Sequence, residues 1–266
     1  MAMHKKTRGG GDDGQICTDA QGSIYRIGFA RPSKYNGFSP SMLQQLAEAY
    51  TELERNERYR VGVIYGIGDH FCAGLDLSKT KLDTDLFPPD CVDPFNLRPP
   101  YRRKPLLAAV QGVCYTLGVE LALAADIVVA ARNTRFSQLE VKRGVMAFGG
   151  ATIRMIERAG WGNAMRYLLT GDEWDAETSL KYGFIQEIVD TGQQLERIME
   201  LAELIACQAP LAVQAMIESA RIAQVEGQAA AVLNFQAQMN RLQASEDYQE
   251  GINSFLERRD GVFIGR

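Results

Sequence analysis

Two glutamates stand in surroundings where a carboxylate could do acid–base chemistry. Glu120 lies inside the apolar run GVCYTLGVELALAAD (112–126), and Glu140 ends the segment TRFSQLE. A buried carboxylate is costly unless it has a partner. Two carboxylates whose environments separate their pKa values can divide the work, one giving a proton and the other taking one. Periodicity alone favours a structural alternative, in which Glu120 pairs with a nearby Arg or Lys and Glu140 is an exposed strand end.

Two glycine-bearing loops could supply hydrogen-bond donors to the same site. The segments FCAGLDL (71–77) and VCYTLGVE (113–120) each place a glycine where a strand hands over to a helix. The first N–H groups of a helix have no acceptor inside it and favour negative charge. Two such loops meeting at one oxygen would form an oxyanion hole. The alternative is that these glycines only let the chain turn, and one loop by itself favours that alternative.

Several other chemistries lack their motifs. The chain has only two histidines, His4 and His70, and no Cys/His cluster with zinc spacing. A Walker loop, a G-x-G-x-x-G after a strand and a G-x-S-x-G elbow are all missing from the sequence. The motifs therefore predict a site without metal or prosthetic group, built from backbone N–H groups and carboxylates.

Composition describes an ordinary globular protein with a sizeable core. The 266 residues are 46% hydrophobic and 23% charged, and the net charge of −4 gives no reason to expect nucleic acid or an acidic membrane as a partner. Five scattered cysteines suggest reduced thiols, and no apolar run is long enough for a transmembrane helix. We expect a cytoplasmic protein whose residues 1–13 form a flexible tail.

Strand and helix patterns alternate along residues 14–208, which predicts an α/β fold with parallel strands joined by right-handed crossovers. A hairpin is expected around DAQGS (19–23), followed by a helix that begins at Pro40 and is capped by Ser39. Strands are predicted at 61–66, 105–112, 126–132 and 183–190, with VCYTLG (113–118) as a turn and VELALAA (119–125) as a helix. Residues 209–266 carry only helical patterns, so this module should pack on the core or on a neighbouring subunit.

Taken in order, these motifs resemble the enoyl-CoA hydratase/isomerase family, the crotonase superfamily. The resemblance runs from about Ile24 to Phe263 and is carried by segments such as GDHFCAGLDL, KPLLAAVQGVCYTLGVELALAAD and EGINSFLERRDGVF. It implies an α/β crotonase-like spiral of ββα units with a C-terminal helical oligomerisation region at 209–266. It also implies a coenzyme A thioester as substrate, no prosthetic group, and a homotrimer or a dimer of trimers.

The resemblance assigns roles within the two loops and the two glutamates. It implies backbone oxyanion-hole donors at Leu75 and Leu117, with Gly118 beside the second. Glu120 and Glu140 match the glutamates of family hydratases, which add water syn across a 2-enoyl-CoA. The chain reads Thr116-Leu117-Gly118 where the family commonly has three glycines, and Ala147-Phe148 where it usually has Pro-Gly.

Coenzyme A contacts are implied for Arg31, Lys34, Ala73 and Gly74, and the segment PPYRRK (99–104) could serve likewise. A solvated loop charge is an equal alternative for Arg31 and Lys34. Residues lining the acyl chain are expected from 80–103 and from the helices after 150. Other crotonase reactions remain open, namely isomerisation, thioester hydrolysis and decarboxylation, as do a non-catalytic acyl-CoA binder and a carbonyl hydratase or hydrolase that does not use coenzyme A.

Overall fold

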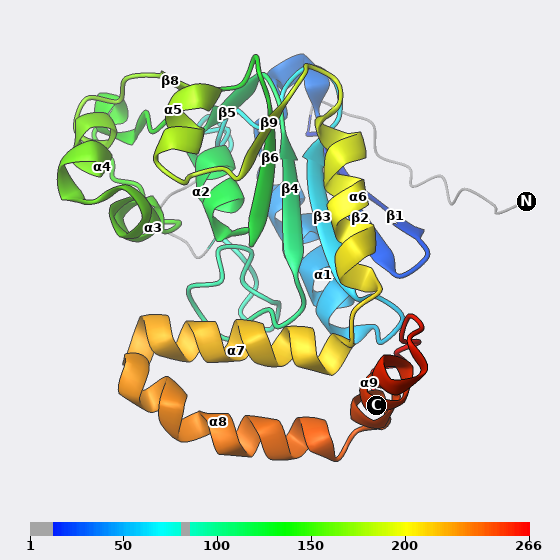
Figure 1. Ribbon diagram of the computed structural model, residues 1–266. Coiled ribbons are helices and arrows are strands. Elements are labelled where there is room, and N and C mark those ends of the chain that lie inside the picture. Colours follow the sequence, from blue (N-terminus) through cyan, green and yellow to red (C-terminus); the bar gives the residue numbers. More distant parts are fainter. Residues whose placement is uncertain (1–12, 81–85) are drawn as a thin grey trace, which may run out of the picture.

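The computed structural model describes residues 13–80 and 86–266, and its centre is a six-stranded sheet in the order β1-β2-β3-β4-β6-β9 (Figure 1). The predicted hairpin is antiparallel β1 (Gln15–Gln21) with β2 (Ile24–Ala30). The remaining pairs are parallel, as the alternation predicted. Those strands are β3 (Val61–Gly66), β4 (Leu106–Val110), β6 (Ile127–Ala131) and β9 (Glu187–Val189).

A second, three-stranded sheet holds the glycine-bearing loops together. It consists of β5 (Val113–Tyr115), β7 (Arg135–Ser137) and β8 (Trp174–Asp175). The prediction of a turn over residues 113–118 was wrong, because β5 pairs in parallel with β7 and also bridges to Cys72. This long-range pairing outweighs the local turn signal. Strand β8 is too short to leave a pattern in the sequence.

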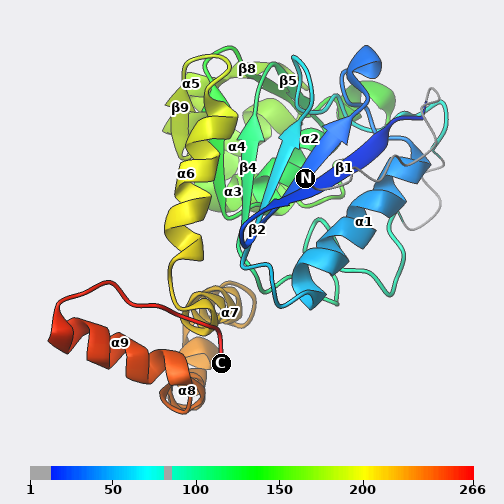
Figure 2. The same cartoon turned by 90° about the vertical axis from the view of Figure 1, so that its right-hand side faces the viewer.

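Helices cover both faces of the large sheet (Figure 2). On one side lies α1 (Pro40–Arg55), which begins as predicted: Pro40 is its first residue and Ser39 Oγ accepts a hydrogen bond from the N–H of Met42 at 3.3 Å. On the other side α6 (Gln194–Ala206) packs on the strands. The remaining helices of this body are α2 (Leu117–Ala124), α3 (Ala151–Ala159), α4 (Trp161–Leu168) and α5 (Ala176–Lys181), with short 3-10 turns η1 (Pro32–Lys34) and η2 (Glu140–Arg143).

Helix α2 is buried along its whole length. Every residue from Leu117 to Ala124 is buried, including Glu120. A helix that is apolar all round belongs in a core, so this segment shows no amphipathic face. The core therefore surrounds the helix that carries the first glutamate.

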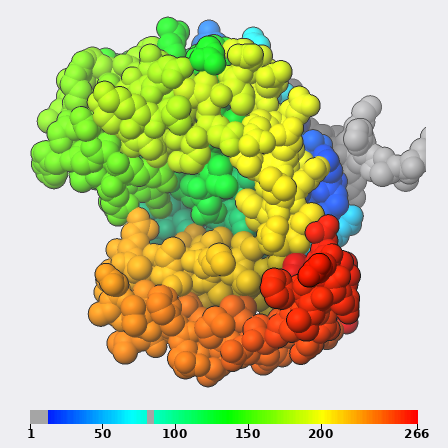
Figure 3. Space-filling view, in the orientation of Figure 1, coloured from blue at the N-terminus to red at the C-terminus, as the bar shows by residue number. Residues whose placement is uncertain are grey.

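The C-terminal helices form a separate layer beyond one end of the large sheet (Figures 1 and 3). They are α7 (Pro210–Glu226), α8 (Gln228–Gln243) and α9 (Glu246–Glu257). Three apolar residues spaced along α8, namely Val232, Phe235 and Met239, are 43–51% exposed. The role of this layer in oligomerisation, and the boundary near Ala209, stay predictions, and the tail predicted for 1–13 lies outside the described residues except for Asp13.

Within the described ranges, no single helix combines the length and apolar character needed to span a membrane. Helices α6 and α7 meet those requirements only as a pair, and that pair is bent by 105° at the break between them.

Candidate active site

Glu120 is buried in the first turn of α2 and its carboxylate is held by the backbone. It is 4% exposed, and Oε1 accepts hydrogen bonds from the N–H groups of Gly149 at 2.6 Å and Ala151 at 3.2 Å. The pKa of Glu120 is raised to about 7, mainly by burial and also by the nearby charge of Glu140, against the two N–H donors and Arg154, which lower it. The structural alternative expected an Arg or Lys side chain paired with this carboxylate. Its hydrogen-bond partners are backbone N–H groups instead.

The contact with Gly149 depends on the absence of a side chain there. A Cβ on Gly149 would lie 2.6 Å from Glu120 Oε2 and 2.6 Å from the ring of Phe95. The guanidinium of Arg154 donates to the carbonyls of Gly149 at 3.3 Å and Phe95 at 2.6 Å. One arginine therefore joins the loop that holds Glu120 to the loop that carries Phe95.

Glu140 opens the 3-10 turn η2, immediately after the small sheet. The side-chain amide of Gln138 is oriented so that its nitrogen faces acceptors and its oxygen faces donors. In this orientation the nitrogen donates to each carboxylate oxygen of Glu140 at 2.8 Å. Burial raises the pKa of Glu140 to about 7. Glu140 is thus a partly buried, oriented carboxyl group and not an exposed strand end. Gln138, itself 1% exposed, was missed by sequence reasoning, although it lies two residues before Glu140 in FSQLE.

In the loop FCAGLDL (71–77), the N–H of Leu75 points away from the neighbouring residue Phe38. Phe38 donates to the carbonyl of Gly74 at 2.8 Å, and Asp76 donates to the carbonyl of Phe38 at 2.9 Å. In this parallel bridge the hydrogen bonds on one side use the groups flanking Leu75. The N–H of Leu75 itself therefore points to the opposite side.

The second loop runs directly alongside the first. Tyr115 donates to the carbonyl of Cys72 at 2.8 Å, and a Cβ on Gly118 would lie 2.8 Å from the same carbonyl oxygen. Gly118 thus allows a close approach of the two loops. Leu117, the first residue of α2, carries one of the N–H groups that have no acceptor within the helix.

A cavity of about 210 Å³ brings these groups together. Leu75, Leu117, Glu120 and Glu140 all line it, together with Ala73 and Thr116. Its other lining residues are Leu77, Leu86, Phe95, Leu139, Arg143, Val145 and Phe148. The segment predicted to line the acyl chain contributes Leu86 and Phe95, while residues 81–85 lie outside the described part of the chain.

The residues predicted to contact coenzyme A differ in their exposure. Lys34 is exposed at the end of η1, and Ala73 lines the cavity next to Gly74. Arg31 is only 3% exposed: its guanidinium donates to the carbonyl of Gly37 at 2.9 Å and pairs with Asp76 at 2.9 Å. The burial of Arg31 favours a role in holding its loop over a role in binding phosphate.

The basic segment 99–104 is also largely structural. Arg102 is 1% exposed and pairs with Asp126 at 2.8 Å. Lys104 Nζ donates to the carbonyls of Leu53 at 2.8 Å and Asn56 at 2.7 Å. These buried contacts leave the two side chains unavailable for a nucleotide.

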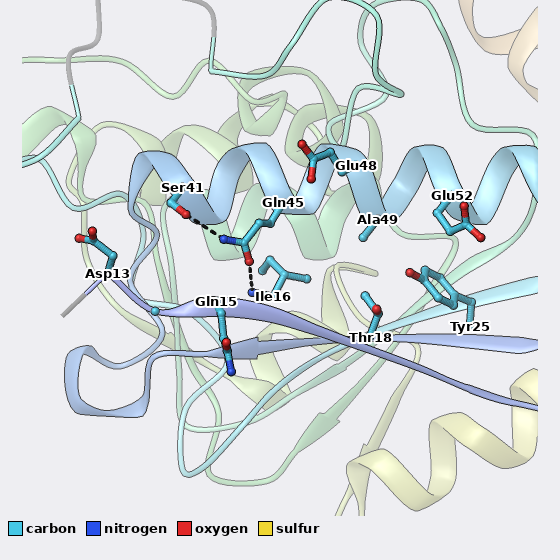
Figure 4. Close-up of a pocket in the computed structure, with 11 residues that line it drawn as sticks. Asp13, Gln15, Ile16, Thr18, Tyr25, Ser41, Gln45, Glu48, Ala49 and Glu52 are labelled. Atoms are coloured by element: carbon cyan, nitrogen blue, oxygen red, sulfur yellow. Dashed lines mark hydrogen bonds between the residues drawn. The ribbon is translucent and has the colours of Figure 1, made fainter. Parts of the chain in front are cut away.

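A second hollow, of about 610 Å³, lies between α1 and β1 (Figure 4). Its charged lining consists of the carboxylates of Asp13, Glu48 and Glu52. Gln45 reaches across it, accepting from the N–H of Ile16 at 2.9 Å and donating to Ser41 Oγ at 2.8 Å. The glutamate pair and both glycine-bearing loops line the other, smaller cavity, which is therefore the candidate active site. The described residues contain no group of three or more His, Cys, Asp or Glu side chains arranged to hold a metal ion.

Comparison with known proteins identifies the family. The enoyl-CoA hydratase/isomerase family profile matches residues 19–266. The chain belongs to that family. It is 31% identical to the 1,2-epoxyphenylacetyl-CoA isomerase of Escherichia coli K12, over 94% of this chain and 98% of that protein. It is 30% identical to the 2,3-dehydroadipyl-CoA hydratase of the same strain, over 95% and 99%.

Solved structures of the enoyl-CoA hydratase/isomerase family agree with this assignment. The crystal structure of a probable enoyl-CoA hydratase/isomerase from Mycobacterium abscessus is 44% identical and superposes with a TM-score of 0.92, covering 94% of this chain and 98% of that one. The fold is therefore the crotonase fold that the sequence motifs implied. The chain is an enzyme of a family that acts on coenzyme A thioesters.

Proposed function

We propose that this chain is an enoyl-CoA hydratase that adds water syn across the double bond of a 2-enoyl-CoA thioester. The observation that carries the proposal is the cavity in which Glu120 and Glu140 meet the loops of Leu75 and Leu117. Two carboxyl groups whose pKa values both lie near 7 suit a reaction that takes one proton and gives another at neutral pH. A relative named as a hydratase, 30% identical, adds support.

In the proposed mechanism the thioester oxygen sits between the N–H groups of Leu75 and Leu117. These donors withdraw electron density from C3 of the substrate and stabilise the enolate as its charge develops. One glutamate accepts a proton from water as the water oxygen bonds to C3, and the other gives its proton to C2. Because the two carboxyl groups are coupled, the pair shares the proton and the two pKa values belong to the pair.

Substrate binding completes the proposal. In this proposal the exposed Lys34 binds a phosphate of coenzyme A, and Ala73 and Gly74 supply backbone beside the thioester. The substrate, water and the two glutamates supply every atom that the hydration needs. A homotrimer or dimer of trimers in the cytoplasm, assembled through the α7–α9 layer, is part of the same proposal.

Rates of hydration of crotonyl-CoA test the proposal. Glu120→Gln and Glu140→Gln should each lower kcat by roughly 10²–10⁴-fold, the usual scale for a general acid or base. Glu48→Gln, an exposed residue of α1 at the remote hollow, is the matched control and should hydrate at the wild-type rate. Wild-type rates in both active-site variants would refute the mechanism.

A substrate panel separates hydration from the other reactions of the family. Wild-type protein should hydrate 2-enoyl-CoA esters faster than it moves the double bond of 3-enoyl-CoA esters or releases free coenzyme A. Double-bond migration, hydrolysis or decarboxylation without hydration would assign a different reaction. Tight binding without turnover of any ester would make the chain a binder, and failure to bind any coenzyme A ester would exclude the thioester substrate.

A further inference from the structure

Thr116 has a backbone conformation that its side chain disfavours. It is the residue just before α2, with φ at 48° and ψ at −113°. Positive φ is uncommon for any residue with a Cβ and is a true outlier for a β-branched one. Such strain persists where the surrounding structure imposes it, often at functional sites. The chain has threonine at this position, where the resemblance led us to expect glycine.

The Thr116 hydroxyl lies beside Gly74 in the cavity that Leu75 and Leu117 also line. A Cβ built on Gly74 would come within 1.9 Å of Thr116 Oγ1, so the hydroxyl rests against the backbone of Gly74. The next residue after Gly74 is Leu75, and the next after Thr116 is Leu117. Gly74, at φ of +102°, thus makes room for the hydroxyl oxygen of a residue that precedes one proposed N–H donor, beside the residue that precedes the other.

This hydroxyl has no hydrogen-bond partner among the residues that the structure describes, and it does not cap α2. Three other helices do have such a cap: Ser39, Asp175 and Ser245 each accept a hydrogen bond from a backbone N–H of the helix that follows. Thr116 instead lines the cavity, half-buried. An O–H group without a protein partner in a catalytic cavity is available to the substrate.

We propose that the Thr116 hydroxyl is a third hydrogen-bond donor to the thioester oxygen, acting with the N–H groups of Leu75 and Leu117. This inference rests on the hydratase function proposed above. In it the O–H donates to the oxygen as the enolate forms, and no proton is transferred. The strained backbone of Thr116 is then the means by which its side chain points toward that oxygen.

Three substitutions separate the hydroxyl from the backbone strain. Thr116→Val keeps the β-branched shape and removes the hydroxyl, Thr116→Ser keeps the hydroxyl, and Thr116→Gly removes both the hydroxyl and the strain. Loss of one oxyanion donor typically lowers kcat by about 10²–10³-fold. We expect about tenfold or more for Val and for Gly, since two backbone donors remain, with KM nearly unchanged and Ser within about threefold of wild type.

A binding measurement gives a readout that a purely structural role would not change. A 3-aryl-acryloyl-CoA absorbs at longer wavelength when its thioester carbonyl is polarised, so its absorption band should shift less in Thr116→Val and Thr116→Gly than in wild type or Thr116→Ser. Thermal unfolding of each variant checks that it is folded.

The outcomes separate this inference from the proposed function. A wild-type band shift and wild-type kcat in Thr116→Gly would overturn the role of the hydroxyl. A wild-type protein that shifts the band but hydrates no enoyl-CoA would overturn the hydratase proposal. The band shifts of the variants would then still decide whether Thr116 donates.

Discussion

The N–H of Gly149 donates to Oε1 of Glu120 at 2.6 Å, and a Cβ on the same glycine would meet both Glu120 Oε2 and the ring of Phe95. The carboxylate is thereby fixed by a loop that follows Glu140 in the chain. Because the two glutamates are joined through this loop, the position of one depends on the conformation that follows the other.

Gly149→Ala should therefore lower hydratase activity strongly. Its methyl group would lie 2.6 Å from both Glu120 Oε2 and Phe95, so the carboxylate or the loop must move. A displacement of about 1 Å in an active site can lower the rate by roughly 10²-fold, and we expect a loss of that size in kcat. Gly162→Ala on α4 is the control, because nothing lies within 4 Å of its added methyl group. It should keep full activity, and equal losses in the two variants would contradict this account of Gly149.

The rate of hydration should depend on pH as a bell centred near pH 7. Both Glu120 and Glu140 have pKa values raised to about 7, mainly by burial, and one proton shared by the pair gives the active form. Below this range both carboxyl groups are protonated and the base is lost. Above it both are ionised and the acid is lost. Steady-state kcat/KM from pH 5 to 9 checks the shape, and a flat profile would exclude a glutamate pair as acid and base.

Stability should depend on pH in the opposite sense from that of a salt-bridged carboxylate. The folded-state pKa of Glu120 is raised from 4.5 to about 7, so the folded protein binds this proton more tightly than the unfolded chain. The contribution is fully present below pH 4.5 and is lost as pH rises to about 7. Glu120→Gln, which cannot titrate, should therefore gain roughly 3 kcal/mol relative to wild type between pH 4.5 and pH 8. Urea unfolding at both pH values measures the difference, and no change in it would show that Glu120 has an ordinary pKa.

Local signals predicted the elements well. The cap at Ser39 and the helix that carries Glu120 follow from neighbouring residues, since caps and apolar helical segments depend on side chains close in sequence. The family motifs further implied the cavity that unites Glu120 with Glu140. Neither inference required a contact between distant segments to be known.

Distant contacts were not predictable. Gly149 holds a carboxylate 29 residues away, and nothing near it in the sequence signals that bond. The family resemblance implied a phosphate contact for Arg31, with a solvated loop charge as an equal alternative, whereas its partner Asp76 is 45 residues away. The strand Val113–Tyr115 likewise forms through pairing with Arg135–Ser137. In each case a long-range contact decides what a local pattern leaves open.

Arg154 offers a test of how the loop around Glu120 is held. It donates to the carbonyls of Gly149 and Phe95, and its charge lowers the pKa of Glu120. Arg154→Met should lower kcat by about tenfold, because the loop loses the hydrogen bonds to the carbonyls of Gly149 and Phe95. It should also shift the pH profile of kcat/KM to higher pH, because the positive charge that lowers the pKa of Glu120 is gone. Arg154→Lys should restore much of the profile because it keeps the charge.

The matched control for Arg154 stands on the same helix. Arg158 donates to the carbonyls of Leu123 at 2.8 Å and Phe184 at 3.4 Å, away from the Gly149 loop. Arg158→Met should reduce the unfolding temperature without moving the pH profile of kcat/KM. If both variants shift the profile equally, the effect comes from general destabilisation of α3. If neither shifts it, the charge of Arg154 does not act on Glu120.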